Sequence, residues 1–152
     1  MATFATEDFF LVKDEIAPML DLHQAELASF PDILADCDWD FYAAAARAGI
    51  LQIFTARDEN SGALLGYAVF VVRKHPHYKT HTWANNDVIW VHPSHRRGGV
   101  GLSFIHHFMT CFKLAGVAVI HMRTKVAHPE LRRALERLDF FADEIGMSKR
   151  LN

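Results

Sequence analysis

The order of hydrophobic and polar positions predicts a chain that begins with helices. Apolar residues recur at helical spacing over residues 12–29, and Pro31 then interrupts the pattern. Asp32 is suited to cap the start of a second helix, which runs to Ala46 and is closed by Gly49. We therefore expect two consecutive helices in the first third of the chain.

The middle of the chain has the pattern of strands. Residues 51–56 are β-prone, and residues 60–62 supply turn chemistry before the apolar run 64–72, which predicts a hairpin. The polar, histidine-bearing residues 73–82 are expected to form a connection. Residues 87–91 follow as a continuous apolar run, which predicts a central strand that is buried on both faces.

The rest of the chain alternates between the two patterns. An apolar stripe over residues 104–115 predicts a helix that ends at Gly116, and residues 117–122 predict the next strand. Pro129 suits the first turn of another helix, and residues 145–151 can form a last strand. Strand, loop, helix and strand in this order form a βαβ unit.

Composition narrows the class of protein. The chain has 152 residues, of which 51% are hydrophobic and 22% charged, with a net charge of -2. These values are typical of one folded domain, here 1–152, and give no support to nucleic-acid binding. The first residues lack the pattern of a secretion signal and no later stretch is long and apolar enough for a membrane span, so we expect a cytoplasmic protein. Cys37 and Cys111 lie far apart and are expected to be reduced thiols.

The segment between the central strand and the next helix carries the clearest chemistry. Gly98, Gly99 and Gly101 leave the backbone open to a ligand, while Arg96 and Arg97 are cations suited to phosphate oxygens. The free N–H groups of the following helix also favour an anion. The loop lacks the Gly-Lys-Ser/Thr ending of a Walker loop and the third glycine of a dinucleotide fingerprint.

What fits is the pattern Arg-x-x-Gly-x-Gly, filled by Arg96, Gly99 and Gly101 and preceded by the strand end 89–93. In this pattern, and in the order of its expected elements over nearly the whole chain, the sequence resembles the GNAT family of N-acetyltransferases. The resemblance implies the α/β acyl-CoA N-acyltransferase fold, in which helices flank a mixed, mostly antiparallel central sheet.

The resemblance also implies a reaction. An acetyl group would pass from acetyl-CoA to a primary amine of a small molecule or a protein, by direct attack in a ternary complex. Acetyl-CoA would lie in a notch between strands ending at Val91 and Val117. The residues expected to hold it, through pantetheine and pyrophosphate contacts, are Ile89, Trp90, Val91, Arg96, Arg97, Gly98, Gly99, Val100, Gly101 and His128.

Catalytic side chains are less well defined by the sequence. Asp87, in the strand that leads to the loop, is the candidate base, and His128 is the candidate that helps the thiolate leave. Glu144 and His121 are the second candidates for the base. Leu135 stands where the family often has a tyrosine acid. A catalytically silent acyl-CoA-binding or regulatory module is therefore the alternative.

The acceptor is not identified by the sequence. Aspartates crowd residues 32–40, and such a cluster would draw a cationic amine. His75, His77 and His81 lack the accompanying ligands of a metal site, so no metal is expected. A homodimer is a possible assembly.

Overall fold

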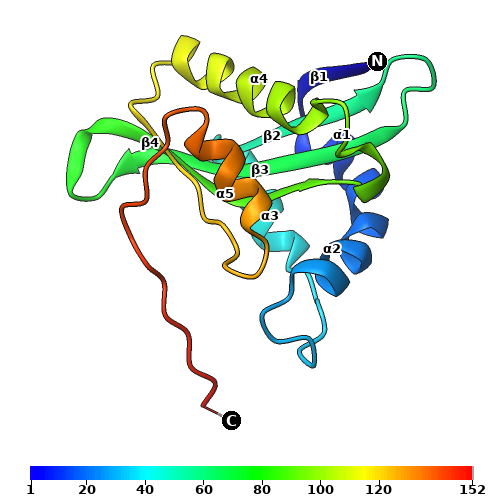
Figure 1. The fold of residues 1–152 in the computed structure, drawn as a ribbon. Helices are drawn as coiled ribbons and strands as arrows, with labels where there is room; N and C mark the ends of the chain where they lie inside the picture. The colour runs from blue at the N-terminus through cyan, green and yellow to red at the C-terminus, as the bar shows by residue number, and fades with distance from the viewer. Residues whose placement is uncertain (152) are drawn as a thin grey trace.

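A five-stranded sheet forms the middle layer of the computed structural model, which describes residues 1–151 (Figure 1). The strands lie in chain order, and every neighbouring pair is antiparallel except β4 and β5, which are parallel. The expected mixed, mostly antiparallel sheet is thus confirmed. The strands are β1 (Ala2–Glu7), β2 (Leu51–Asp58), β3 (Leu64–His75), β4 (Tyr78–Val91) and β5 (Val119–His121).

Helices cover both faces of this sheet (Figure 1). Helices α4 and α5 lie on one face, and α1 and α3 pack on the other beside α2. The helices are α1 (Phe9–Ile16), α2 (Leu20–Leu27), α3 (Trp39–Arg47), α4 (Val100–Leu114) and α5 (Pro129–Glu136), with short 3-10 turns η1 (Ala17–Met19) and η2 (Pro93–His95).

Aromatic side chains fill the core between α4 and the sheet. Phe54 of β2 and Phe70 of β3 are almost completely buried against Phe108 and Phe112 of α4. The Phe70 and Phe112 rings meet edge to face, with centroids 4.9 Å apart, a geometry that aromatic rings favour. This packing fixes α4, and with it the glycine loop, against the end of β4.

The first helices differ from the prediction at their boundaries. The expected helix over residues 12–29 is divided by the turn that contains Pro18, whose ring nitrogen has no N–H for a helical hydrogen bond. The expected start at Asp32 is wrong, because α3 begins at Trp39. Its cap is Asp38, whose carboxylate accepts a hydrogen bond from the Phe41 N–H at 2.9 Å. Gly49 ends the segment with a positive φ of 69°, as predicted.

Two expectations for the sheet are also corrected, and the structure adds one strand that was not predicted. Residues 73–82 belong mostly to β3 and β4, whose hairpin turns at Pro76 and His77, because strand pairing satisfies the backbone of a polar segment as well as an apolar one. Residues 2–7, which the pattern left without an element, form β1. Residues 145–151 form no strand, and Ile145 and Met147 are exposed in a tail that leads away from the sheet (Figure 1).

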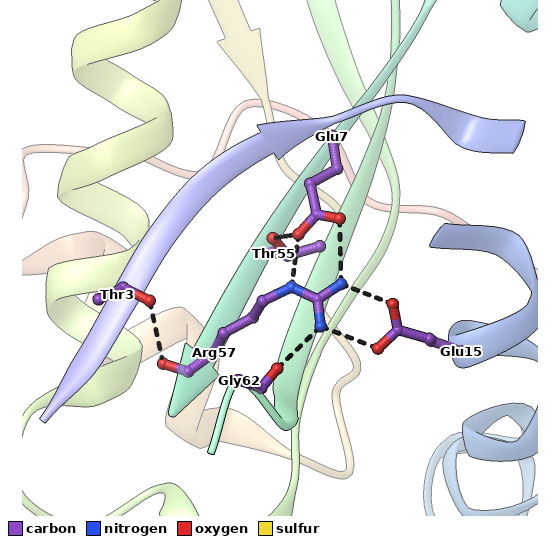
Figure 2. Close-up of polar contacts among 6 residues, drawn as sticks. All are labelled: Thr3, Glu7, Glu15, Thr55, Arg57 and Gly62. Atoms are coloured by element: carbon purple, nitrogen blue, oxygen red, sulfur yellow. Dashed lines mark hydrogen bonds and ion pairs between the residues drawn. The ribbon is translucent and has the colours of Figure 1, made fainter. Parts of the chain in front are cut away.

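Strand β1 is attached to the rest of the fold through Arg57 of β2 (Figure 2). The guanidinium donates to Glu7 of β1, with an Nε to Oε1 distance of 2.6 Å, and to both carboxylate oxygens of Glu15 on α1. Thr55 donates to the same Glu7 oxygen at 2.5 Å, and Arg57 also reaches the carbonyl of Gly62. One side chain therefore connects two strands, a helix and a turn.

Candidate functional site

An extra residue in β4 creates the centre of the site. Along the antiparallel pair, Val69 of β3 lies opposite Val88, whereas the next residue, Phe70, lies opposite Asn86. Asp87 is therefore the additional residue of a β-bulge, a feature that bends a strand and redirects a side chain. Its carboxylate is exposed, although it stands in the middle of an otherwise covered sheet.

Beside this bulge, β4 separates from β5. The last parallel partners are Asn85 and His121, and beyond them Asn86 spans the gap. The Asn86 side chain is 4% exposed, accepts from the Arg123 N–H at 2.6 Å and donates to the Arg123 carbonyl at 3.3 Å. The notch expected next to Val117 instead begins after His121, because the strands run parallel and part at their carboxyl ends.

Past the notch, one edge of β4 is left open. His92 donates its N–H to the Leu65 carbonyl of β3. Hydrogen-bond directions alternate along a strand, so the backbone groups of Ile89 and the N–H of Val91 point the other way, into the gap, while the Val91 carbonyl on that side accepts from Arg96. An extended ligand can therefore pair with this edge of β4.

The glycine loop continues directly from that edge. Gly98 and Gly99 have left-handed backbone angles, with φ of 82° and 85°, and α4 begins at Val100. Within residues 1–151, the N–H groups from Arg97 to Leu102 donate to no protein acceptor. A side chain at Gly101 would meet nothing within 4 Å. The loop thus presents free amide donors to open space, which is the requirement for binding phosphate oxygens.

The Arg96 side chain is committed to the protein. Its Nε donates to the Val91 carbonyl at 2.8 Å, and its two terminal nitrogens donate to the Glu26 carboxylate at 2.5 and 2.6 Å. Glu26 also accepts from the Trp90 ring N–H at 3.0 Å. The hydrogen bonds from Arg96 hold the pKa of Glu26 below its usual value, so the carboxylate stays ionised. Arg96 thereby fastens the loop to α2, and Arg97 is the exposed loop cation.

These features surround a cavity of about 400 Å³. Residues of β4, the glycine loop, α2 and α5 form its wall. Those named as sequence candidates are Asp87, Ile89, Trp90, Val91, Arg96, Gly99, Gly101 and His128. Arg97, Gly98 and Val100 lie in the same loop but outside the wall of the cavity.

Asp87 is joined to α3 by a short hydrogen bond. The Tyr42 hydroxyl donates to its Oδ2 atom at 2.6 Å. Burial and this bond to the carboxylate raise the pKa of Tyr42, so its hydroxyl keeps its proton. The second carboxylate oxygen of Asp87 remains available to a ligand in the cavity.

His23 is a site residue that the sequence did not single out. It lies on α2, and its Nδ1 atom is 3.2 Å from the hydroxyl of Tyr67, which is buried in β3. Burial lowers the pKa of His23, which favours a neutral ring, and the ring stacks on Trp90. The sequence indicated only that His23 lies in the helix expected over residues 12–29. The spacing of apolar residues in that helix did not indicate that His23 packs against β4.

Leu135 and His128, which replace side chains that are usual in the family, lie in different environments. Leu135 is 4% exposed and belongs to the core beneath α5. His128 stands at the start of α5 on the wall of the cavity, which Glu26 also lines. Of the two second candidates for the base, His121 lies 3.6 Å from the Asp143 carboxylate, and Glu144 is exposed in the tail.

The sequence matches the pattern that defines the Acetyltransferase (GNAT) family over residues 18–140. The chain belongs to the GNAT family. The matched range contains the bulge, the open strand edge, the glycine loop and α5, which are the parts that form the cavity.

Solved structures share this fold over 95% or more of their length. A ribosomal-protein-alanine N-acetyltransferase from Brucella melitensis biovar Abortus 2308 is 21% identical, with a TM-score of 0.73 and coverage of 100% of both chains. An aminoglycoside acetyltransferase from an uncultured soil metagenomic sample, in complex with trehalose, is 11% identical with a TM-score of 0.76, covering 99% of this chain and 95% of its own. A predicted acetyltransferase with acetyl-CoA from Clostridium acetobutylicum is 12% identical with a TM-score of 0.70, covering 99% and 96%.

At these identities the likeness establishes the fold alone. The search of the curated proteins found no match. Among the described residues, none of the helices has the length and apolar character needed to cross a membrane, and no group of three or more potential ligands is arranged to hold a metal ion.

Proposed function

We propose that this GNAT protein is an N-acetyltransferase that moves an acetyl group from acetyl-CoA to a primary amine. The proposal rests on three features that lie next to one another along the first cavity. Free amides from Arg97 to Leu102 suit a pyrophosphate, the open edge at Ile89 and Val91 suits an amide-bearing arm, and Asp87 stands where that arm would end.

The cofactor would be held mainly by backbone groups. The pyrophosphate of acetyl-CoA accepts hydrogen bonds from the loop amides, and Arg97 adds a cation at the surface. The pantetheine arm pairs with Ile89 and Val91 as a short added strand. Trp90 holds Glu26 and so the loop, and His128 contacts the arm from the opposite wall.

The reaction is a direct displacement. A neutral amine nitrogen forms a bond to the thioester carbon, the carbon–sulfur bond breaks, and the electron pair leaves on the CoA sulfur. The amine loses one proton to Asp87, directly or through water, and the thiolate takes up one proton from His128 or solvent. A backbone N–H of Ile89 or Val91 can donate to the carbonyl oxygen as negative charge develops there.

Tyr42 supports the proposed role of Asp87. Because the Tyr42 hydroxyl donates to Oδ2 at 2.6 Å, it fixes the carboxylate, and the Oδ1 atom can accept the proton of the amine. Neither Cys37 nor Cys111 is placed as a nucleophile in the cavity wall. This arrangement favours a ternary complex over an acyl-enzyme.

The test has two parts. Calorimetry with acetyl-CoA measures binding, and thiol release with a panel of primary amines measures transfer. Binding with amine-dependent release is the expected result. Binding without release from any amine would favour the silent acyl-CoA-binding module, and failure to bind acetyl-CoA would refute both.

A further inference from the structure

A second cavity lies on the other side of Asp87 from the proposed cofactor groove. It has a volume of about 410 Å³ and is formed chiefly by the β3–β4 hairpin. Asn86, Asp87 and Arg123 line both cavities. A molecule in the second cavity would therefore meet a ligand of the first at the bulge, where β4 and β5 part.

Side chains from β3 and β4 of the hairpin form one wall of this cavity. Val71, Arg73 and His75 alternate along β3, and Arg73 lies opposite Trp83 on β4. The rings of His75 and Trp83 are in contact, with centroids 4.3 Å apart, and Tyr78 stacks parallel to Trp83. His75 and Trp83 line the cavity together with Arg73 and Asp87, and Tyr78 packs against them from outside its wall.

The charges around the cavity are mainly positive. Arg73, Lys74 and Arg123 line it, and Asp87 is the single carboxylate of its wall. Within residues 1–151, none of these three cations forms a salt bridge. Lys74 donates only to the Thr80 carbonyl, at 3.3 Å. The cavity thus offers cationic donors from the hairpin at Arg73 and Lys74, and Arg123 beside the carboxylate of Asp87 where the two cavities share their wall.

Two of the acidic residues expected to attract a cationic amine have local partners, and none of those at residues 32–40 lines the second cavity. Asp38 caps α3, and Asp32 accepts a hydrogen bond from Arg150 of the tail. A cationic diamine that entered the second cavity would bring like charge beside Arg73 and Arg123, which is unfavourable. An anionic group there would gain charge-assisted hydrogen bonds.

We propose that the acceptor is a small amine that also carries an anionic group, a carboxylate or a phosphate. Its anionic group binds Arg73 and Arg123, and its amino group lies at Asp87 beside the thioester. This inference rests on the proposed acetyl transfer and specifies the class of its acceptor.

Matched pairs of amines test the inference. In the carboxylate arm, 4-aminobutyrate is compared with 4-aminobutanamide, and in the phosphate arm, O-phosphoethanolamine is compared with ethanolamine. Spermidine is the cationic comparison. We expect the anionic member of at least one pair to have a kcat/KM roughly tenfold higher than its neutral partner, as charge-assisted hydrogen bonds predict, and spermidine to be the poorest acceptor.

Substitution of Arg73 locates the effect. Arg73→Gln should raise KM for the preferred anionic amine roughly tenfold and leave KM for its neutral partner unchanged, because Arg73 lines the second cavity and not the first. Lys79→Gln is the matched control, since Lys79 is exposed on the same hairpin and outside the cavity wall.

The outcomes are separable from those of the proposed function. Transfer that is fastest to spermidine, or an Arg73→Gln defect equal for charged and neutral amines, would overturn the anionic acceptor while acetyl transfer stands. Absence of both acetyl-CoA binding and thiol release in every arm would overturn the proposed function, and the inference with it.

Discussion

Asp87 is exposed because a single extra residue bends β4. In a regular strand, successive side chains alternate between the two faces of the sheet, so Asp87 would point to the face opposite that of Asn86 and Val88. The bulge instead leaves Asp87 without a partner in the ladder and beside Tyr42 of α3. The proposed base is therefore positioned by backbone geometry, and Tyr42 fixes only its orientation.

Substitution of Asp87 tests this assignment. We expect Asp87→Asn to lower kcat about 100-fold, within the range typical of a lost general base, with the Kd for acetyl-CoA unchanged. His23→Gln should lower kcat by less than about tenfold, because His23 is the neutral partner of Tyr67 in this proposal. The reverse order of the two defects would make His23 the base.

A substitution at Gly101 can test acetyl-CoA binding to the loop without changing the stability of the fold. It has no positive φ, and an added Cβ would meet nothing within 4 Å. Gly101→Val should therefore leave the melting temperature essentially unchanged, whereas the Kd for acetyl-CoA should rise roughly tenfold or more as the branched side chain obstructs the loop amides. Calorimetry and thermal unfolding measure the two effects.

Thr110→Val on the same helix is the control for this prediction. Thr110 is exposed and lies outside the cavity wall, so this variant should retain acetyl-CoA binding. Equal binding by Gly101→Val and the unsubstituted protein would mean that the loop does not hold the cofactor.

At the scale of elements, the hydrophobic pattern located helices and strands better than it located their ends. The stripe of Phe104, Phe108 and Phe112 predicted α4 because a helix must bury one face. The hairpin of residues 73–82 was missed because polar strands carry no such pattern. These residues include Arg73 and form most of the second cavity.

The Arg57 network is an element-scale feature with a measurable contribution. Arg57→Gln should lower the free energy of unfolding by about 2 kcal/mol at pH 7, because Glu7 loses its cationic partner in a largely covered position. The matched control Arg132→Gln removes an exposed pair with Glu136 on α5 and should cost less than about 0.5 kcal/mol. Urea unfolding measures both values.

The same network gives a pH dependence. Hydrogen bonds from Arg57 lower the pKa of both Glu7 and Glu15 in the folded protein. Their stabilising effect is therefore complete above the unfolded glutamate pKa of about 4.3 and is lost as pH falls through the lower folded values. The difference between Arg57→Gln and the unsubstituted protein should shrink below about pH 4. A difference that stayed constant to pH 2 would contradict this account.

At the scale of the whole molecule, the two cavities share a wall formed by Asn86, Asp87 and Arg123. The groove between the glycine loop and α5 reaches Asp87 from one side, and the hairpin cavity reaches it from the other. A ligand in either cavity would therefore lie beside the same carboxylate. This geometry supports direct transfer in a ternary complex.

The tail after Phe140 contributes little to this body. Phe141, Ile145, Met147 and Leu151 are each more than 80% exposed. Deletion of residues 141–152 should change the melting temperature by less than about 2 °C, because few buried contacts are lost. A larger fall would show that the tail packs in solution. Light scattering on both forms also tests the homodimer, which stays a prediction.

The sequence by itself determined the alternation of elements, because hydrophobic spacing and glycine placement act over short stretches of chain. The mixed sheet followed from the family resemblance, and the glycine loop as a phosphate site stays a prediction. Ile89 and Val91, implied by that resemblance, and Gly99 and Gly101, marked by the glycine pattern, all line the first cavity. Tertiary structure decided the bulge at Asp87, the Glu26–Arg96 clamp, the place of His23 and the cationic hairpin cavity. Each depends on residues distant in sequence, whose contacts are set by strand register and helix packing and leave no local pattern.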